Sequence, residues 1–274
     1  MNVMNYKHYH VHPLLRNWIR YFWSYDVYTP EIQTLHIRSF ADRYPRLIFQ
    51  DITSSSFITE TNGTTKPICY LSGIDTLPTD TFWDSRFSHF GVSFHPHALH
   101  TFFRLDAAQL TDQTPDIQLL EKEEITHLLI NSKSHEERVA VLHRYFYEKV
   151  TIGKSDPIIE QLFCGNAHGI PDNEIKLAAI AKYHNISERQ LQRRFKQSVG
   201  ISARKFTRLA KFEKSLHALS TACYGDLTRV GYDAGYADQS HFIHDFKLFS
   251  GISPSDFLRN QSLGSESASF IYPE

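Results

Sequence analysis

The chain has 274 residues, of which 41% are hydrophobic, 14% aromatic and 22% charged. This composition is typical of a folded globular protein and excludes a disordered or collagen-like chain. No apolar run approaches the ~18 residues of a membrane span, and no secretion signal is visible, so we expect a cytoplasmic protein without a membrane partner. The three cysteines stand far apart and form no CxxC pair, which argues against a disulfide framework and against structural zinc.

The formal net charge of −1 conceals an uneven distribution. Residues 176–259 carry 14 Lys and Arg against 7 Asp and Glu, whereas residues 1–175 carry 15 against 21. A basic third joined to an acidic remainder indicates a polyanionic partner for that third.

The first 95 residues contain short apolar segments of the kind that form β-strands. The segments are rich in aromatic and β-branched residues, and turn signals such as Pro45, Asn62-Gly63 and Pro78 separate them. We expect strands at 21–28, 34–40, 46–51, 55–61, 68–73 and 87–95. A short helix around Pro13–Ile19 is also expected, with proline in its first turn. This series predicts a barrel or a sandwich with some helical cover.

From about residue 97 the apolar period becomes helical. The spacing predicts one helix at 99–105, another at 117–129 and a third at 139–150, before which Ser134 and Glu137 have the spacing of a capping box. These helices either cover the strands or pair with a second copy of the chain, and packing within their own domain is the simpler interpretation. The clearest break in the pattern is 165–172, where we place a domain boundary.

The C-terminal third contains an internal repeat. FKQSVGISARKFTR, which begins at Phe195, and FKLFSGISPSDFLR, which begins at Phe246, share seven of 14 positions. Each copy is read as a short helix, a tight turn, an N-capped second helix and a terminal glycine. The turn residues are Asn185 and Gly235, the caps are Ser187 and Asp238, and the glycines are Gly200 and Gly251. This order predicts two helix-turn-helix units, with Ser202–Leu219 as one long helix between them.

The second helix of such a unit enters the major groove of DNA, and the polar faces here suit that role. The outward residues are Glu188, Arg189, Gln192, Arg193, Lys196 and Gln197 in the first copy, and Gln239, Ser240, His241, Ile243, His244 and Lys247 in the second. Arg and Gln have forked donors that read guanine and adenine edges. Phosphate contacts are expected from Ser202, Arg204, Lys205, Lys247 and Ser253, close to helix ends. An ordinary solvated face is the alternative for either helix alone, but the duplication and the basic charge favour DNA.

The segments SERQLQRRFKQSVGIS and GYADQSHFIHDFKLFSGISPSDF resemble the two signatures of the AraC/XylS family of transcription regulators. The resemblance covers about a third of the chain, from about Ile175 to Arg259, and implies a DNA-binding domain of seven helices that acts at bacterial promoters. By position it implies base contacts from Arg189, Gln192 and Arg193, and from Gln239, Ser240, His241 and His244. His244 stands where many members have Arg, which would make reading by the second helix weaker or dependent on pH. Ala203 replaces the usual Pro.

The N-terminal half is similar, more loosely, to a domain that precedes this tandem in some family members. The similar segments are ADRYPRLIFQ, LSGIDTLP and FGVSFHPHALHTFF, and they imply an effector or regulatory module. We therefore predict an α+β chain with four parts. These are a β-rich, barrel-like sensor domain at 1–110, a helical connector at 111–170 that could dimerise, the tandem helix-turn-helix at 171–260 and a flexible tail at 261–274.

Sixteen histidines raise the alternative of a metal site. His95, His97 and His100 form the densest cluster, and His8, His10 and His12 alternate as on one strand face. A cupin-like site would need a carboxylate soon after the HxH pair, yet none occurs before Asp106. Phosphate loops, nucleophile elbows and HExxH motifs are absent from the sequence. We therefore expect no catalytic residue, metal or other cofactor, and keep a cupin-like metal-binding protein with an appended DNA-binding domain as the alternative.

The leading interpretation is a sequence-specific transcription regulator that reads two successive major grooves with helices 188–199 and 238–249. Its expected partner is double-stranded DNA at a promoter or operator. RNA polymerase joins as a partner if the protein activates, and a small-molecule effector and a second copy of the chain are further expectations. Such a protein would lie in the cytoplasm, on the nucleoid when bound to DNA. A structural DNA binder without a sensor is a third interpretation.

Overall fold

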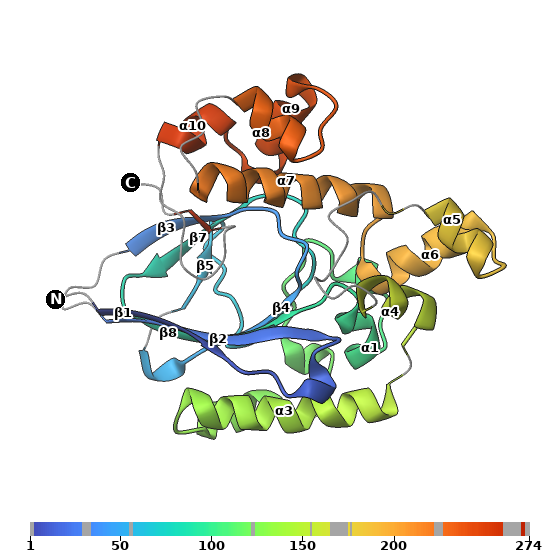
Figure 1. Ribbon diagram of the computed structural model, residues 1–274. Coiled ribbons are helices and arrows are strands. Elements are labelled where there is room, and N and C mark those ends of the chain that lie inside the picture. The colour runs from blue at the N-terminus through green and yellow to red at the C-terminus, as the bar shows by residue number, and fades with distance from the viewer. Residues whose placement is uncertain are drawn as a thin grey trace.

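The structure is a computed structural model that describes residues 3–28, 34–54, 57–121, 124–153, 155–164, 175, 177–221, 227–259 and 270–271. Two antiparallel sheets form its N-terminal part, and helices form its C-terminal part (Figure 1). One sheet has the order β1 (Val3–Tyr9), β2 (Ile19–Tyr28), β8 (Phe87–Phe94), β4 (Arg46–Gln50), β6 (Cys69–Ser72). The other has the order β5 (Thr59–Glu60), β7 (Thr79–Asp84), β3 (Thr34–Ser39), β9 (Phe270–Ile271).

The mainly β domain followed by an all-α domain is confirmed, and the barrel-like closure is corrected. No ladder joins the edge strands of the two sheets within the described residues, so they stay open and stack as a sandwich. The short strand β5 pairs with β7 through only two residues, which leaves that edge unable to close. Of the two expected arrangements, the sandwich is the one that forms.

Strands β8, β4 and β6 of the five-stranded sheet are buried on both faces, because successive side chains point alternately toward the second sheet and toward a core on the opposite side. Leu47, Phe49, Leu71, Phe90 and Val92 point away from the second sheet into a core that also contains helix residues. That core includes Leu142 and Phe146 of α3 (His135–Ile152) and Phe102 of α1 (Ala98–Phe103). The helices expected around 99–105 and 139–150 therefore pack within their own domain.

The strands that were not predicted are the edge strand β1, the strand β7 and the two-residue strand β9. VMNYKHY and TDTFWD lack a clear apolar alternation, because each strand has polar side chains on both faces. The helix expected at 117–129 is broken into a single 3-10 turn, Ile117–Leu119, and α2 (Ile125–Asn131). The helix expected at 13–19 is also only a 3-10 turn, Pro13–Leu15.

The C-terminal part begins with a helix that was not predicted, α4 (Pro157–Cys164). The remaining helices are α5 (Leu177–Tyr183), α6 (Glu188–Val199), α7 (Ala203–Thr221), α8 (Leu227–Asp233), α9 (Gln239–Ser250) and α10 (Pro254–Arg259). Ile159 and Phe163 of α4 lie in the same core as α6 and α7, although α4 precedes the boundary proposed at 165–172. That boundary and tail residues 261–269 lie outside the described residues.

The turn and cap residues predicted for both units adopt the expected conformations. Asn185 and Gly235 have φ of +54° and +91°, and Gly200 and Gly251, which follow α6 and α9, have φ of +101° and +78°. Ser187 and Gln190 form a capping box at the start of α6. The Asp238 side chain accepts a hydrogen bond from the backbone N–H of His241 at 2.8 Å, which caps α9.

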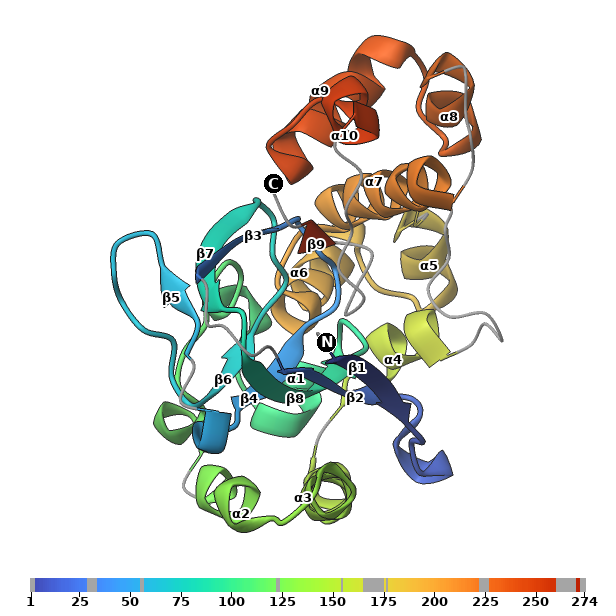
Figure 2. The same cartoon turned by 90° about the vertical axis from the view of Figure 1, so that its left-hand side faces the viewer.

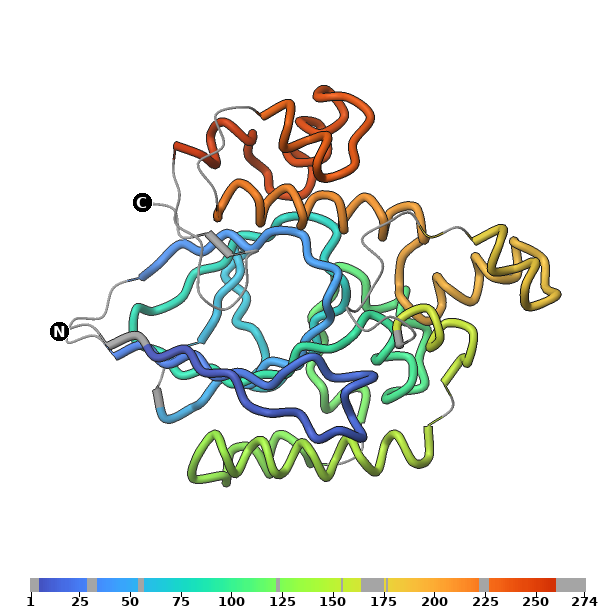
Figure 3. The backbone as a smooth tube through the Cα atoms, viewed as in Figure 1, coloured from blue at the N-terminus to red at the C-terminus, as the bar shows by residue number. Residues whose placement is uncertain are grey.

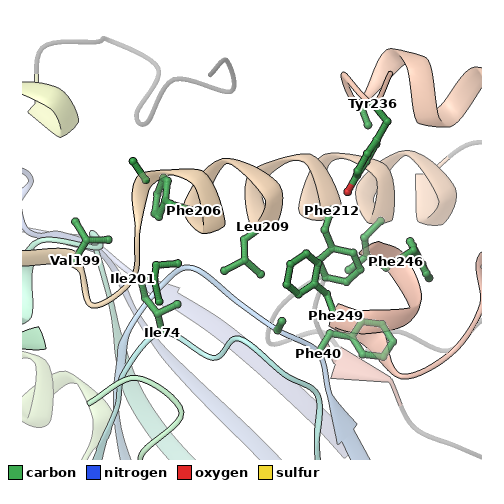
Figure 4. Close-up of a cluster of buried hydrophobic side chains, with 14 of the residues drawn as sticks. Phe40, Ile74, Val199, Ile201, Phe206, Leu209, Phe212, Tyr236, Phe246 and Phe249 are labelled. Carbon is green, nitrogen blue, oxygen red and sulfur yellow. The ribbon is translucent and has the colours of Figure 1, made fainter. Parts of the chain in front are cut away.

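The long helix α7 connects the two units and packs against the N-terminal domain. Figure 4 shows Phe212 of α7 beside Phe249 of α9, with Phe40 below them, and Ile74 below Ile201. Figure 2 shows α2 and α3 on one side of the sheets and α7 to α10 on the other. The tube in Figure 3 follows the chain from α3, through α4, to α5 and α6 beyond one end of α7. Among the described residues, no helix has both the length and the hydropathy to cross a bilayer.

Candidate DNA-binding surface

Both second helices contribute side chains to one groove. Its volume is about 1140 Å³, and we call it the shared groove. It is lined by residues 175 and 177–179, Glu188 and Gln192 of α6, Ser202, Ala203, Arg204, Thr207, Arg208 and Lys211 along α7, and His241 and His244 of α9. The two helix-turn-helix units therefore present α6 and α9 to a common open surface, with α7 between them (Figure 1).

Eight residues of α6 and α9 were predicted to form the DNA-binding face, and all eight are exposed. Gln192, His241 and His244 line the shared groove, as do the phosphate candidates Ser202 and Arg204. The other base candidates lie on the outward surfaces of α6 and α9 beyond that groove, and they are Arg189, Arg193, Lys196, Gln239 and Ser240. The phosphate candidates outside the groove are Lys205, Lys247 and Ser253.

Local contacts fix the orientation of α6. Leu191, Phe195 and Val199 are buried, so the polar face of the helix must turn outward. The Gln192 side-chain amide donates to the Glu188 carboxylate at 3.0 Å, four residues earlier on the same face. Arg194 forms an ion pair of 3.1 Å with Asp156, just before α4, and so attaches α6 to the helix that precedes the tandem.

An ion pair that the sequence analysis missed holds α9 against α7. Asp245 is 1% exposed although it lies within α9, and both of its oxygens accept from Arg208, at 2.6 and 3.1 Å. The hydrogen bond to Asp245 raises the pKa of the Arg208 guanidinium. His244 also contacts Asp245 at 3.3 Å and keeps most of its ring in solvent. Asp245 thus sets the angle at which its neighbour His244 faces the groove.

The basic side chains of α7 follow one face of the helix. Arg204, Arg208 and Lys211 are separated by four and three residues, and all three line the shared groove. Of these three residues, only Arg204 was predicted to contact phosphate. The spacing of four and three residues along the predicted long helix also places Arg208 and Lys211 on the same face. Together they make the floor of the groove attractive to a phosphate backbone.

The two serines proposed for phosphate contacts have different surroundings. The Ser202 hydroxyl accepts from the backbone N–H of Lys205 at 3.3 Å and lies next to Arg204. The Ser253 hydroxyl donates to the Asp256 carboxylate at 2.5 Å, and this bond lowers the pKa of Asp256. A carboxylate at that position opposes an approaching phosphate, so Ser202 has the better surroundings for the role.

The histidine cluster does not converge on a metal position. Ring centroids of His95 and His97 are 6.4 Å apart, His97 stacks on Phe163 of α4 at 5.0 Å, and His100 Nδ1 lies 2.6 Å from the Leu105 carbonyl oxygen. Burial lowers the pKa of His97 to about 3 and that of His95 to about 4, so both rings are neutral. In the part of the chain that the structure describes, no three His, Cys, Asp or Glu side chains are arranged to hold a metal ion.

Comparison with known proteins now identifies the tandem. Residues 180–260 match a helix-turn-helix domain family, and residues 7–116 match a domain of unknown function, DUF6597. The arabinose operon regulatory proteins of Salmonella typhimurium and Escherichia coli are each 30% identical over 88 residues, which is 32% of this chain. Residues 180–260 therefore belong to a helix-turn-helix domain family and are similar to the arabinose operon regulatory proteins.

The matched stretch spans about a third of the length of these two relatives, 31% and 30%. Among solved structures, ToxT of Vibrio cholerae is similar with a TM-score of 0.42 at 15% identity, over 84% of this chain and 98% of ToxT. The C-terminal domain of AraT from Geobacillus stearothermophilus has a TM-score of 0.34 at 23% identity, over 41% of this chain and 92% of that domain. The roles of single residues on α6 and α9 stay predictions.

Removing the carboxylate that holds α9 is expected to loosen this surface. Asp245→Ala should lower the free energy of unfolding by about 2 kcal/mol. The substitution removes the buried carboxylate that accepts two hydrogen bonds from Arg208, while the Arg208 side chain can still be solvated by water. Urea unfolding followed by circular dichroism measures this change. Asp233→Ala is the control, because its pair with Arg229 is long, 3.7 Å, and exposed, so a loss as large as that of Asp245→Ala would contradict the assignment.

Proposed function

We propose that this chain is an AraC-family, sequence-specific regulator of transcription that inserts α6 and α9 into successive major grooves on one face of DNA. The observation that supports this most directly is the shared groove, to which both helices contribute and whose floor is basic. Base edges would be read by Arg189, Gln192 and Arg193 on α6, and by Gln239, Ser240, His241 and His244 on α9. Lys196 and the phosphate candidates Ser202, Arg204, Lys205, Lys247 and Ser253 would position the backbone.

We also propose that the N-terminal domain regulates this surface. Each DNA-reading helix ends on a contact with that domain. The Thr111 hydroxyl donates to the carbonyl oxygen of Gly200, directly after α6, at 3.0 Å. The backbone N–H of Ala41 donates to the carbonyl oxygen of Phe249, in the last turn of α9, at 2.9 Å. A small change in the N-terminal domain can therefore reach both helices, and this is the physical basis for the regulatory role.

Arg193→Ala tests base reading by α6. We expect binding to the cognate site to weaken by about 1–3 kcal/mol and discrimination at one base pair to relax, because a forked donor to a base edge is lost. The cognate site comes first from selection in a random DNA pool, and fluorescence anisotropy then compares the variant on cognate and scrambled duplexes. Arg144→Ala, the same change of charge on the exposed face of α3, is the control.

Two results would contradict this proposal. An equal loss on cognate and scrambled DNA would show that Arg193 contributes charge and no base reading. An affinity for DNA that does not fall with rising salt concentration would show that the protein makes no phosphate contacts, since the release of counterions makes such binding steeply dependent on salt. The length of the selected site also reports whether one copy or a homodimer binds, and a promoter assay with RNA polymerase separates activation from repression.

A further inference from the structure

A cavity of about 570 Å³ lies between the two sheets of the N-terminal domain. Strands of both sheets line it, including β4, β6 and β8 on one side and β3, β5 and β7 on the other. Its walls contain the aromatic ring of Trp83, the imidazole of His89 and the carboxyls of Asp75 and Asp112. We call it the inter-sheet cavity.

The face of the five-stranded sheet that meets this cavity is polar although it is buried. Arg46, Ser72 and His89 point toward the second sheet and are at most 6% exposed, whereas their neighbours along the strands are the apolar residues of the core beneath. A sandwich normally fills the space between its sheets with apolar side chains. Buried polar groups around a cavity differ from this apolar packing, and they indicate a binding site for a polar ligand.

His89 is the clearest sign of a missing partner. It is 1% exposed, and neither ring nitrogen has a hydrogen-bond partner among the residues that the structure describes. The ring is stacked on Phe87 at 4.6 Å and meets the Trp83 ring edge-on at 4.8 Å, so it is held in place without a polar contact. Burial lowers its pKa to about 3, so the neutral ring presents one donor and one acceptor. Buried polar atoms are rarely left unsatisfied, and a ligand in the cavity would supply the partner.

The charges around the cavity favour a cation. Four carboxyls line it, against the two basic side chains Arg46 and Lys66, and one of the four, Asp80, is paired with Arg38. Both bases are already engaged, Arg46 with Asp42 and Lys66 with Glu60. Among the described residues, Asp75 and Asp112 form no ion pair and are held by hydroxyl and backbone donors only.

Asp75 lies in a buried group of carboxyls that Arg46 compensates only in part. Burial raises the pKa of Asp75 to about 7; the charge of Arg46 opposes this rise, and the nearby carboxylates of Asp42 and Asp112 add to it. A positive charge placed beside Asp75 and Asp112 would relieve their mutual repulsion, whereas an anion would add to it. The aromatic face of Trp83 offers the apolar part of an organic cation a surface on which to pack.

We propose that the inter-sheet cavity binds a small organic amine in its cationic form, with the ammonium group beside Asp75 and Asp112 and the remainder of the molecule against Trp83 and His89. Binding itself needs no DNA. Its consequence for transcription rests on the regulatory role proposed above for the N-terminal domain.

Three segments that line the cavity also touch the DNA-binding domain, which gives the ligand a route to α6 and α9. Ser39 lines the cavity and precedes Phe40, whose ring meets Phe212 of α7 and Phe257 of α10, and Ala41, which donates to Phe249 of α9. Pro78 lines the cavity and lies against Gly251, directly after α9. Asp112 lines it and follows Thr111, which contacts Gly200 after α6.

Two matched series of compounds test the charge of the ligand. Phenethylamine, 2-phenylethanol and phenylacetate share an aromatic ring and differ in charge, and putrescine, 1,4-butanediol and succinate are the aliphatic equivalents. We expect at least one amine to raise the thermal midpoint of the full chain and to give a saturable isothermal titration curve, since a ligand of the folded state stabilises it. The proposal is overturned if neither amine binds at millimolar concentration, or if a neutral or anionic counterpart binds as tightly.

Variants locate the site. Asp75→Asn and Asp112→Asn each keep a hydrogen-bond acceptor and should weaken amine binding at least tenfold, whereas Asp84→Asn, at the end of β7 and outside the cavity, should leave it unchanged. Binding that survives both cavity variants places the amine elsewhere and overturns the assignment. Anisotropy on the selected DNA then separates the two proposals. If amine binding is lost in the variants but DNA affinity never responds to amine, the site stands and the regulatory role fails.

Discussion

Replacing Phe40 by alanine is expected to lower the free energy of unfolding by about 3–5 kcal/mol, the usual range for a buried Phe→Ala substitution. Phe40 is 1% exposed, and its ring meets those of Phe212 and Phe257 at centroid distances of 6.4 and 6.3 Å (Figure 4). These contacts join the end of β3 to the core of the DNA-binding domain. The substitution therefore opens a cavity in the junction between the two domains, which urea unfolding measures.

Calorimetry should also show where the stability is lost. We expect the wild-type chain to unfold in one transition, because Phe40, Ala41 and Ile74 belong to the same core as the helices from α4 to α10. In Phe40→Ala that transition should divide into two, with one part of the chain melting before the other. Phe82→Ala is the control, because Phe82 is 37% exposed on β7, and its loss should stay below about 1 kcal/mol. Equal losses from the two variants would contradict a shared core.

The junction also explains how the two reading helices keep a fixed relation. Each unit is attached to α7, yet each also ends on the N-terminal domain, through Thr111 for α6 and Ala41 for α9. Gly200 has no room for a side chain there, since a Cβ would lie 2.8 Å from the Thr111 hydroxyl. The tandem is thus attached to the N-terminal domain near the C-terminal ends of both α6 and α9, in addition to the connection through α7.

The DNA-binding domain could be predicted from sequence because its signals are local. Ser187, Asp238, Gly200 and Gly251 each mark a helix end within a few residues of the chain, and the repeat shows the same marks twice. The helical spacing of the apolar residues in each second helix also predicted that the candidate base contacts would be exposed. Asp245 was not predicted, because nothing in the sequence shows that an acid on the presumed outer helix turns inward to meet Arg208.

The sandwich and its cavity were less accessible from sequence. Strand β7 reads as polar because Thr79 and Thr81 face the inter-sheet cavity and not a dry core. The cavity is assembled from strands and loops far apart along the chain, so no local pattern marks His89 or Asp75 as neighbours. His95, His97 and His100, the histidines of the metal alternative, are close in sequence, but their rings make separate contacts and do not converge.

Replacing Arg43 by methionine is expected to cost about 3 kcal/mol, because it leaves a buried carboxylate without its counter-charge. Arg43 and Glu213 of α7 are 170 positions apart, and their side chains are 7% and 17% exposed. Arg43 Nε donates to Glu213 at 2.7 Å, and the backbone N–H of Arg43 donates to the other carboxylate oxygen at 3.1 Å. Methionine retains the packing on Phe206 while removing the charge. Lys7→Met, which breaks an exposed pair with Glu136, is the control and should leave stability nearly unchanged.

The loss in Arg43→Met should depend on pH and should be reversed by a second substitution. Burial raises the pKa of Glu213 in the folded chain, and the charges of Arg43 and Arg20 oppose that rise, so removing Arg43 raises the pKa further. In the unfolded chain the pKa of a Glu side chain is about 4.3. Above that pH, folding of the variant requires protonation of Glu213, so the variant's loss of free energy of unfolding relative to wild type grows as the pH rises toward 7. Arg43→Met with Glu213→Gln keeps an acceptor for the Arg43 N–H and removes the stranded charge, so most of the stability should return. Urea unfolding across this pH range measures the effect. A double variant that is as unstable as Arg43→Met throughout the range would show that packing around Arg43, and not the buried charge pair, joins α7 to the N-terminal domain.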